Sequence, residues 1–252
     1  MAINKTDLLI KTQETRNALG EDDHSPMDIF SLVQQIDKLT IVKYPMGDRL
    51  SGMCVKGNYN NIIVINSKNT LGRQRFSLAH ELYHLYYDDN MTAICLNSIG
   101  SGNDIEKSAD QFATYFLIPP VTLQQKIKET KRLSVTHQLN IDDVVNLEQY
   151  FGVSRQAILS RLISENEIDQ SFAETMKTNV IQSAVSLGYS DELYRPSPEN
   201  KQYMTNGYLI KQINEAYNKD LISNGKYEEL LLQAFRSDLV FGYDDERGET
   251  FD

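Results

Sequence analysis

The sequence predicts an α+β fold in which a small β-sheet comes before a central buried helix, and a mostly helical region follows. Three observations support this class. The run H-E-L-Y-H at residues 80–84 lies in a strongly apolar stretch of helical length. Short strand-like segments fall between residues 40 and 66. From residue 121 onward, apolar residues recur mainly at helical spacing.

The N-terminal elements follow from apolar spacing and turn residues. Helices are predicted over residues 4–19 and 27–38, where apolar positions repeat every three to four residues. Residues 40–44 read as a strand. Residues 51–57 and 61–66 read as a β-hairpin, joined through Asn58, Tyr59 and Asn60.

The central helix carries two histidines at helical spacing. Residues four apart share one helix face, so His80 and His84 can point at one metal ion. Glu81 lies about 100° round the helix, where it can take a proton from water at the metal. The alternative is two packed histidines beside a glutamate by chance. The flanks are apolar, however, and buried imidazoles need partners. H-E-x-x-H is the signature of zincin metalloproteases, which bind zinc.

A zinc site needs a third protein ligand, and a second helix supplies the candidates. Residues 104–120 show helical spacing, and Glu106 extends the apolar stripe of that helix. A buried carboxylate is unfavourable without a cation, which favours Glu106 as the ligand. Its alternative role is an interaction with the helix dipole. Asp104 is the competing ligand and is expected to cap the helix. Asp110 shares the face of Glu106 and is expected to hold the other N–H of a ligand histidine.

Other potential ligands are given structural roles. Cys54 and Cys95 form no C-x-x-C pair and are expected to be small core residues in a reducing cytoplasm. Asp88 and Asp89 are expected to be solvated turn residues.

In zincins, a sheet edge beside the H-E-x-x-H helix commonly accepts the substrate as an added strand. Met53 and Val55, or their neighbours on the other face, are candidates to line such an edge. The alternative for these two residues is a plain half-buried hairpin.

A helix–turn–helix segment follows the second helix. Residues 121–132 read as a polar helix, and residues 142–150 and 154–163 as two helices joined by a short turn. A DNA-binding interpretation would use Ser154, Arg155, Gln156, Ser160 and Arg161 as readers and phosphate contacts. The other interpretation is a helical hairpin packed on the core. The net charge of −10 favours the hairpin and argues against direct nucleic-acid binding as a function class.

The C-terminal region is predicted to be mainly helical. Helical spacing covers residues 170–187, 206–219 and 224–237, with loops at 193–198 and 204–208. The tail, residues 244–252, is expected to fray.

The predicted organisation is a metallopeptidase domain over residues 1–165, which includes the helix–turn–helix-like segment 142–163, and a helical region over 166–252. No apolar run reaches the length of a membrane span, and the N-terminus lacks the apolar core of a signal peptide. The expected location is therefore cytoplasmic, without a membrane partner.

Two motifs resemble the ImmA/IrrE family of bacterial zinc metallopeptidases. These are R-x-R-F-S-L-A-H-E-L-Y-H from Arg73 and E-x-x-A-D-x-F-A-x-x-F-L-I-P from Glu106, and the resemblance spans about residues 40–240. It implies that His80, His84 and Glu106 bind zinc and that Glu81 is the general base. Members often carry Gly at the position of Tyr83, whose bulk is expected to affect substrate access. Many carry Asn at the position of Asp110.

The sequence therefore leads to one functional hypothesis and two alternatives. The hypothesis is a zinc-dependent endopeptidase in which Glu81 acts as the general base. The resemblance implies cleavage of a helix-turn-helix repressor, which would release genes of a mobile element, a prophage or a stress response. The alternatives are a non-catalytic, zinc-containing DNA-binding regulator and a toxin–antitoxin partner protein.

Overall fold

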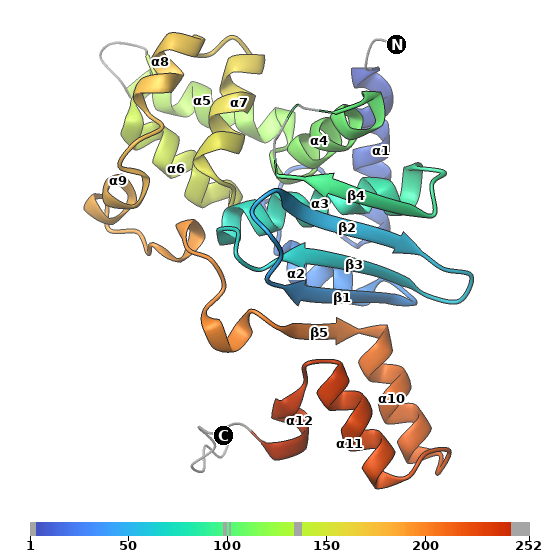
Figure 1. Ribbon diagram of the computed structural model, residues 1–252. Coiled ribbons are helices and arrows are strands. Elements are labelled where there is room, and N and C mark those ends of the chain that lie inside the picture. The colour runs from blue at the N-terminus through green and yellow to red at the C-terminus, as the bar shows by residue number, and fades with distance from the viewer. Residues whose placement is uncertain (1–3, 98–99, 101, 134–137, 243–252) are drawn as a thin grey trace.

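The computed structural model describes residues 4–97, 100, 102–133 and 138–242, and the predicted frayed tail lies outside these residues. Its centre is a mixed sheet of five strands in the order β4-β2-β3-β1-β5, surrounded by helices (Figure 1). This arrangement confirms the predicted α+β class.

Three strands of the sheet agree with the predictions. These are β1 (Leu39–Tyr44), β2 (Leu50–Lys56) and β3 (Asn61–Asn66). β2 and β3 pair antiparallel as the predicted hairpin, whereas β1 pairs with β3 in parallel. The two edge strands, β4 (Thr92–Leu96) and β5 (Met204–Gly207), are not predicted from the sequence. Both pair with strands far away in the chain, and no local turn signal marks such a pairing.

β4 changes the position of the sheet edge that borders the central helix. It pairs antiparallel with β2, so β2 is an internal strand. Met53 and Val55 therefore do not line an edge, and they are half-buried, as the alternative interpretation of the hairpin expects. The strand edge beside the central helix belongs to β4.

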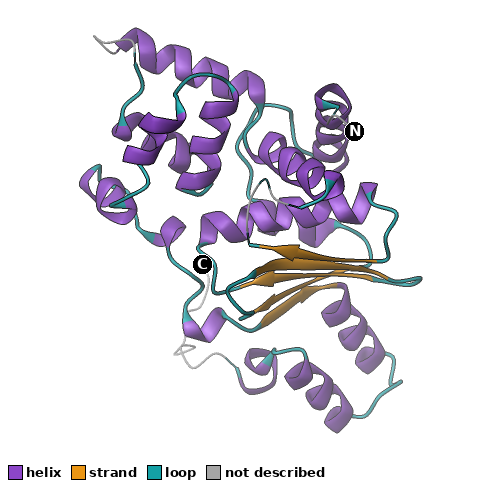
Figure 2. Cartoon of the chain, turned by 45° about the horizontal axis from the view of Figure 1, so that its top comes forward, coloured by secondary structure: helices purple, strands orange, loops and turns teal. Residues whose placement is uncertain are grey.

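The central helix α3 (Leu71–Tyr87) begins after Thr70, whose hydroxyl accepts from the amide of Arg73. It lies across β2 and β3, with α1 (Lys5–Ala18) and α4 (Asp104–Leu117) packed above it (Figure 2). Phe76, Leu78 and Leu82 on this helix are almost completely buried. Because the sheet and α4 enclose α3 between them, polar side chains on these faces are removed from water.

The remaining helices surround this centre. They are α2 (Ile29–Leu32), α5 (Pro120–Leu133), α6 (Ile141–Phe151), α7 (Arg155–Ser164), α8 (Gln170–Thr175), α9 (Val180–Ser186), α10 (Tyr208–Asn218), α11 (Asn224–Gln233) and α12 (Ser237–Phe241). Two predictions are longer than the observed helices. The predicted helix 27–38 gives α2 and a short 3₁₀ turn. The predicted helix 170–187 is divided at Asn179, whose φ of 54° lies in the left-handed region.

The C-terminal region continues the sheet before it forms helices. β5 pairs antiparallel with β1, and α10, α11 and α12 follow beyond this edge (Figure 1). The domain boundary after residue 165 stays a prediction. Among the described residues, no helix is long and apolar enough to cross a membrane.

The helix–turn–helix segment forms a packed hairpin of α6 and α7. Gly152 makes the turn with a φ of 63°, and Ser154 caps α7. Arg155 is buried and ion-paired with Glu148, and it also donates to the carbonyl of Met176. A buried, paired guanidinium does not reach DNA phosphates, so Arg155 does not serve as a DNA contact.

The second basic candidate in the hairpin is buried as well. Arg161 is 2% exposed and lies over the ring of Tyr115, 4.6 Å from its centroid. It also pairs with Glu165 at 3.0 Å. Of the five candidate DNA contacts, only Gln156 and Ser160 are exposed. The hairpin therefore lacks the exposed cations that phosphate binding requires.

The Glu148–Arg155 pair gives a stability prediction. Arg155→Met should lower the free energy of unfolding by about 3–5 kcal/mol, because Glu148 would remain buried without its partner. The exposed neighbour provides the control, since Gln156→Ala should change stability by no more than about 0.5 kcal/mol. Urea denaturation of both variants measures the difference. Equal stabilities would contradict the role of the pair.

Candidate metal centre

α3 brings two imidazoles together inside the protein. His80 and His84 are 6% and 1% exposed, and their Nε2 atoms are 3.1 Å apart. The spacing of four residues predicts this arrangement, because one turn of helix stacks the two side chains. Both Nε2 atoms point toward the same small region between α3 and α4.

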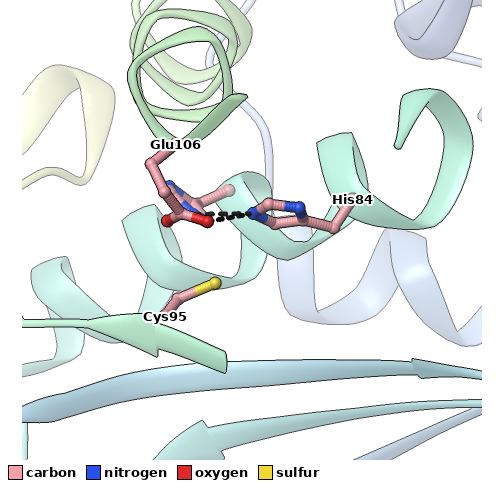
Figure 3. A group of neighbouring side chains, drawn as sticks. His84, Cys95 and Glu106 are labelled. Carbon is pink, nitrogen blue, oxygen red and sulfur yellow. Dashed lines mark hydrogen bonds and ion pairs between the residues drawn. The ribbon is translucent and has the colours of Figure 1, made fainter. Parts of the chain in front are cut away.

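α4 adds a carboxylate to the two imidazoles. The Glu106 oxygens lie 3.3 Å from His80 Nε2 and 3.5 Å from His84 Nε2 (Figure 3). Ligand atoms about 2.0–2.1 Å from a tetrahedral ion lie about 3.3 Å from one another. Oε2 is the oxygen near His80 and Oε1 the one near His84, so the carboxylate as a whole faces both nitrogens at separations close to those that a small divalent cation requires.

The competing ligand, Asp104, lies away from this group. It is exposed in the first turn of α4. The predicted capping role is wrong for Asp104, because Asn103 occupies the N-cap and accepts from the amide of Glu106. The cap lies one residue before Asp104. The Asn103 backbone is extended there, and its short side chain reaches the amide of Glu106 in the first turn of the helix.

Asp110 lies behind the first histidine. Its Oδ1 is 2.8 Å from Nδ1 of His80, and it also accepts from the amide of Gly100. A carboxylate at Nδ1 selects the tautomer that presents a free Nε2 lone pair to a metal. Asp110 therefore has the geometry expected for orienting His80.

Asp88 does the same for the second histidine, and the prediction that it is a solvated turn residue is wrong. Its Oδ2 is 2.8 Å from Nδ1 of His84, and the residue is only 8% exposed. Asp88 directly follows Tyr87, the last residue of α3, and its carboxylate turns back onto the helix face. The spacing of four residues from His84 to Asp88 was the signal available in the sequence. Asp89, in contrast, is exposed as expected.

The charges of the metal-free site depend on this packing. Burial alone lowers the pKa of His80, but hydrogen bonds to Asp110 and Glu106 raise it to about 9. Burial and the neighbouring His80 charge lower the pKa of His84. The hydrogen bond from His80 lowers the pKa of Glu106. A metal would take the place of the His80 proton between the same groups.

Glu81 lies on the other side of the histidines, against the sheet. It is completely buried, and neither carboxylate oxygen has a hydrogen-bond partner among the described residues. A Cβ on Gly52 of β2 would lie 2.5 Å from Glu81 Oε1, so only glycine leaves room for the carboxylate. Burial raises the pKa of Glu81 to about 7, and the nearby His80 charge opposes this shift. An unpartnered buried carboxylate is costly and marks a functional group.

Cys95 is a member of the group that sequence reasoning assigns only to the core. The ligand atoms of His80, His84, Cys95 and Glu106 all lie within 4.8 Å of one another. The cysteine comes from β4, an element that the sequence does not predict. No sequence signal links it to the histidines, because the contact depends on how β4 pairs with β2.

Tyr83 packs in the core beside one of the two histidines, with its ring edge-on to that of His84 and 6.1 Å between the centroids. It is 8% exposed, and its ring packs against Phe112 of α4 and beneath Lys11 of α1. Its bulk is thus accommodated in the core between these helices, and the expected effect on substrate access stays a prediction.

The donor set fits a divalent metal ion. Two imidazole nitrogens and a carboxylate oxygen converge, and each histidine is held by a carboxylate at its other nitrogen. This combination suits zinc and its neighbours among the transition metals. His80, His84 and Glu106 are thus brought together, with Glu81 beside them and Asp110 behind.

Burial of Glu81 predicts how stability depends on pH. Its folded pKa of about 7 lies above the ordinary value of 4.5, so the unfolded chain loses this proton first as pH rises. Between these pH values the metal-free protein should lose up to about 3 kcal/mol of stability from this group. Glu81→Gln should remove that loss, and exposed Asp89→Asn should not. Urea denaturation of metal-free samples from pH 5 to 8 tests this, and parallel curves for Glu81→Gln and wild type would refute it.

Comparison with known proteins agrees with this geometry. Residues 39–163 match the family model of the IrrE N-terminal-like domain, Peptidase M78. The comparison with individual curated proteins gives no match. The matched range contains α3, β4 and α4, and with them every member of the group of ligand atoms. Residues 39–163 therefore belong to the Peptidase M78 family as an IrrE N-terminal-like domain, and this membership implies a metallopeptidase.

Proposed function

We propose that the protein is a zinc-dependent endopeptidase. One observation carries the proposal: two imidazole nitrogens and the Glu106 carboxylate converge at 3.1–3.5 Å, beside the buried Glu81 carboxylate, which has no hydrogen-bond partner among the described residues. A structural zinc site has no use for a free carboxylate at its side, whereas hydrolysis requires a base there.

Each residue has a definite part in this proposal. His80, His84 and Glu106 would hold zinc, which when bound lowers the pKa of water and polarises the scissile carbonyl. Glu81 would take the proton of the attacking water and pass it to the leaving amine. A pKa of about 7 suits this exchange, because such a group both accepts and donates a proton near neutral pH. Gly52 would keep the space that Glu81 occupies.

The substrate is proposed to bind as an added strand on β4. This strand is at one end of the sheet order and borders the ligand group through Cys95. Its outward-facing side chains Ile94 and Leu96 are 59% and 57% exposed. An extended peptide paired with this edge would run past the ligand atoms.

A helix-turn-helix repressor in the cytoplasm is the substrate that we propose. The chain carries a net charge of −10, which favours encounter with a basic, DNA-binding partner. Its cleavage would derepress genes of a mobile element, a prophage or a stress response. A toxin–antitoxin partner would use the same chemistry in another setting. A DNA-binding regulator is less well supported, because Arg155 and Arg161 are buried.

The role of Glu81 is tested by a substitution that preserves its shape. Glu81→Gln should retain zinc and lose about 10²–10⁴-fold in cleavage rate, because no base remains. The substrate can be a proteome-derived peptide library, with cut sites counted by mass spectrometry. Gly52→Ala should also impair cleavage while zinc is retained, since it displaces the carboxylate. Undiminished cleavage by Glu81→Gln would remove it as the base.

The ligand set is tested by zinc content. His84→Ala and Glu106→Ala should each lose zinc, because too few protein ligands remain. Asp104→Ala is the matched control: it removes an acid from the same helical turn, outside the group, and should retain one zinc per chain. Elemental analysis after dialysis measures all three variants. Full zinc content in His84→Ala would contradict the assignment.

The proposed substrate needs a direct trial. A helix-turn-helix protein encoded beside this gene should be cut at a defined position by the zinc-loaded protein, and should remain intact with a chelator or with Glu81→Gln. If the library peptides are cleaved but this protein is not, the proposed repressor substrate is rejected and the proposed peptidase activity stands.

A further inference from the structure

Cys95 occupies a place that the proposed peptidase mechanism does not use. It lies in β4, and its side chain points toward His84 and Glu106 (Figure 3). It is fully buried, and its sulfur lies within 4.8 Å of all three other ligand atoms. The other cysteine, Cys54, is equally buried on the adjacent strand but lies outside this group. Burial alone therefore does not account for the position of Cys95.

The sheet is locally distorted where it presents Cys95. Gly52 pairs with Cys95 and Leu50 with Leu96, so Ser51 is an extra residue in β2, a β-bulge. The Ser51 hydroxyl donates to the carbonyls of Cys95 and Leu96, at 3.3 and 3.1 Å. Bulges re-aim side chains and are common beside functional sites. Here the bulge holds the cysteine at the edge nearest the ligand group.

The same register places Cys95 next to Glu81. Gly52, the partner of Cys95, is the residue whose missing Cβ makes room for the Glu81 carboxylate. Glu81 is completely buried and has no hydrogen-bond partner among the described residues. The thiol and the carboxylate thus border the same position beside the two imidazole nitrogens. Water that is to be activated by Glu81 would have to compete with the sulfur for that position.

The distances permit a bond from the sulfur to the metal. A thiolate about 2.3 Å from tetrahedral zinc lies about 3.6 Å from the nitrogen and oxygen ligands. Since the four ligand atoms lie within 4.8 Å of one another, the sulfur would have to move inward by no more than about 1 Å. Thiolate is a preferred zinc ligand, and its binding releases the thiol proton to solution.

We propose that Cys95 is a fourth protein ligand of the metal, which closes the site in the resting protein. The inference rests on the metal site of the proposed function and adds a state to it. Four protein ligands are typical of closed zinc sites, and three ligands with water are typical of catalytic ones. Cys95 must therefore withdraw before Glu81 can act on water. Because Cys95 lies on the strand proposed to pair with substrate, that pairing is the event that would move it.

Cobalt spectroscopy tests the bond without relying on cleavage. The metal-free, reduced full chain is loaded with Co²⁺ as wild type, Cys95→Ser and Cys54→Ser. Thiolate-to-cobalt charge-transfer absorption in the near ultraviolet is expected in wild type and Cys54→Ser, and should be absent in Cys95→Ser. The visible d–d bands should persist in all three. Zinc should also bind Cys95→Ser at least about tenfold more weakly than Cys54→Ser.

The outcomes separate this inference from the proposed function. Visible bands without charge transfer in wild type, or charge transfer that survives in Cys95→Ser, would overturn Cys95 as a ligand and leave the three-ligand site intact. No visible bands in any protein would overturn the metal site itself. If Cys95→Ser fails to fold, the rates at which a thiol reagent alkylates Cys95 and Cys54 of the wild type, with and without zinc, test the bond instead. Zinc should protect Cys95 more than Cys54, and equal protection of both would count against the bond.

Discussion

The structure depends on one constraint: the polar groups of α3 are enclosed between a sheet and a second helix, where water cannot solvate them. His80, His84 and Glu81 are all almost completely buried on this helix. Unpartnered polar groups in such a place cost several kcal/mol. Carboxylates hydrogen-bond to both imidazoles, whereas Glu81 has no hydrogen-bond partner in the described part of the chain. That imbalance is the reason for proposing Glu81 as the base.

The residues around the ligand atoms accommodate the buried polar side chains of α3 in different ways. Asp110 and Asp88 each hold the outer nitrogen of one histidine, so both rings present Nε2 inward. Gly52 contributes by lacking a side chain, which lets the Glu81 carboxylate rest against β2. These contacts come from α4, the end of α3 and the sheet. The site is therefore a property of how three layers pack, with α3 as their common element.

The proposed closed and open states describe two uses of the same buried space. With Cys95 bound, four protein ligands would satisfy a metal and keep water away from Glu81. With Cys95 withdrawn, three protein ligands would remain, and water could enter and give its proton to Glu81. β4 carries the cysteine and also offers the free strand edge, so one element would link peptide binding to the state of the metal.

The sequence by itself determined the local parts of this protein. The spacing of His80 and His84, the stripe that includes Glu106 and the hairpin of β2 and β3 are all set by neighbours a few residues apart, because helical and strand periodicities are local. Pairing between distant segments decided the rest. β4 and β5 carry no local signal that names their partners, so the sheet edges and the position of Cys95 could not be predicted. Asp88 and Arg155 turned out to be buried for the same reason, since burial depends on which surfaces the tertiary structure brings together.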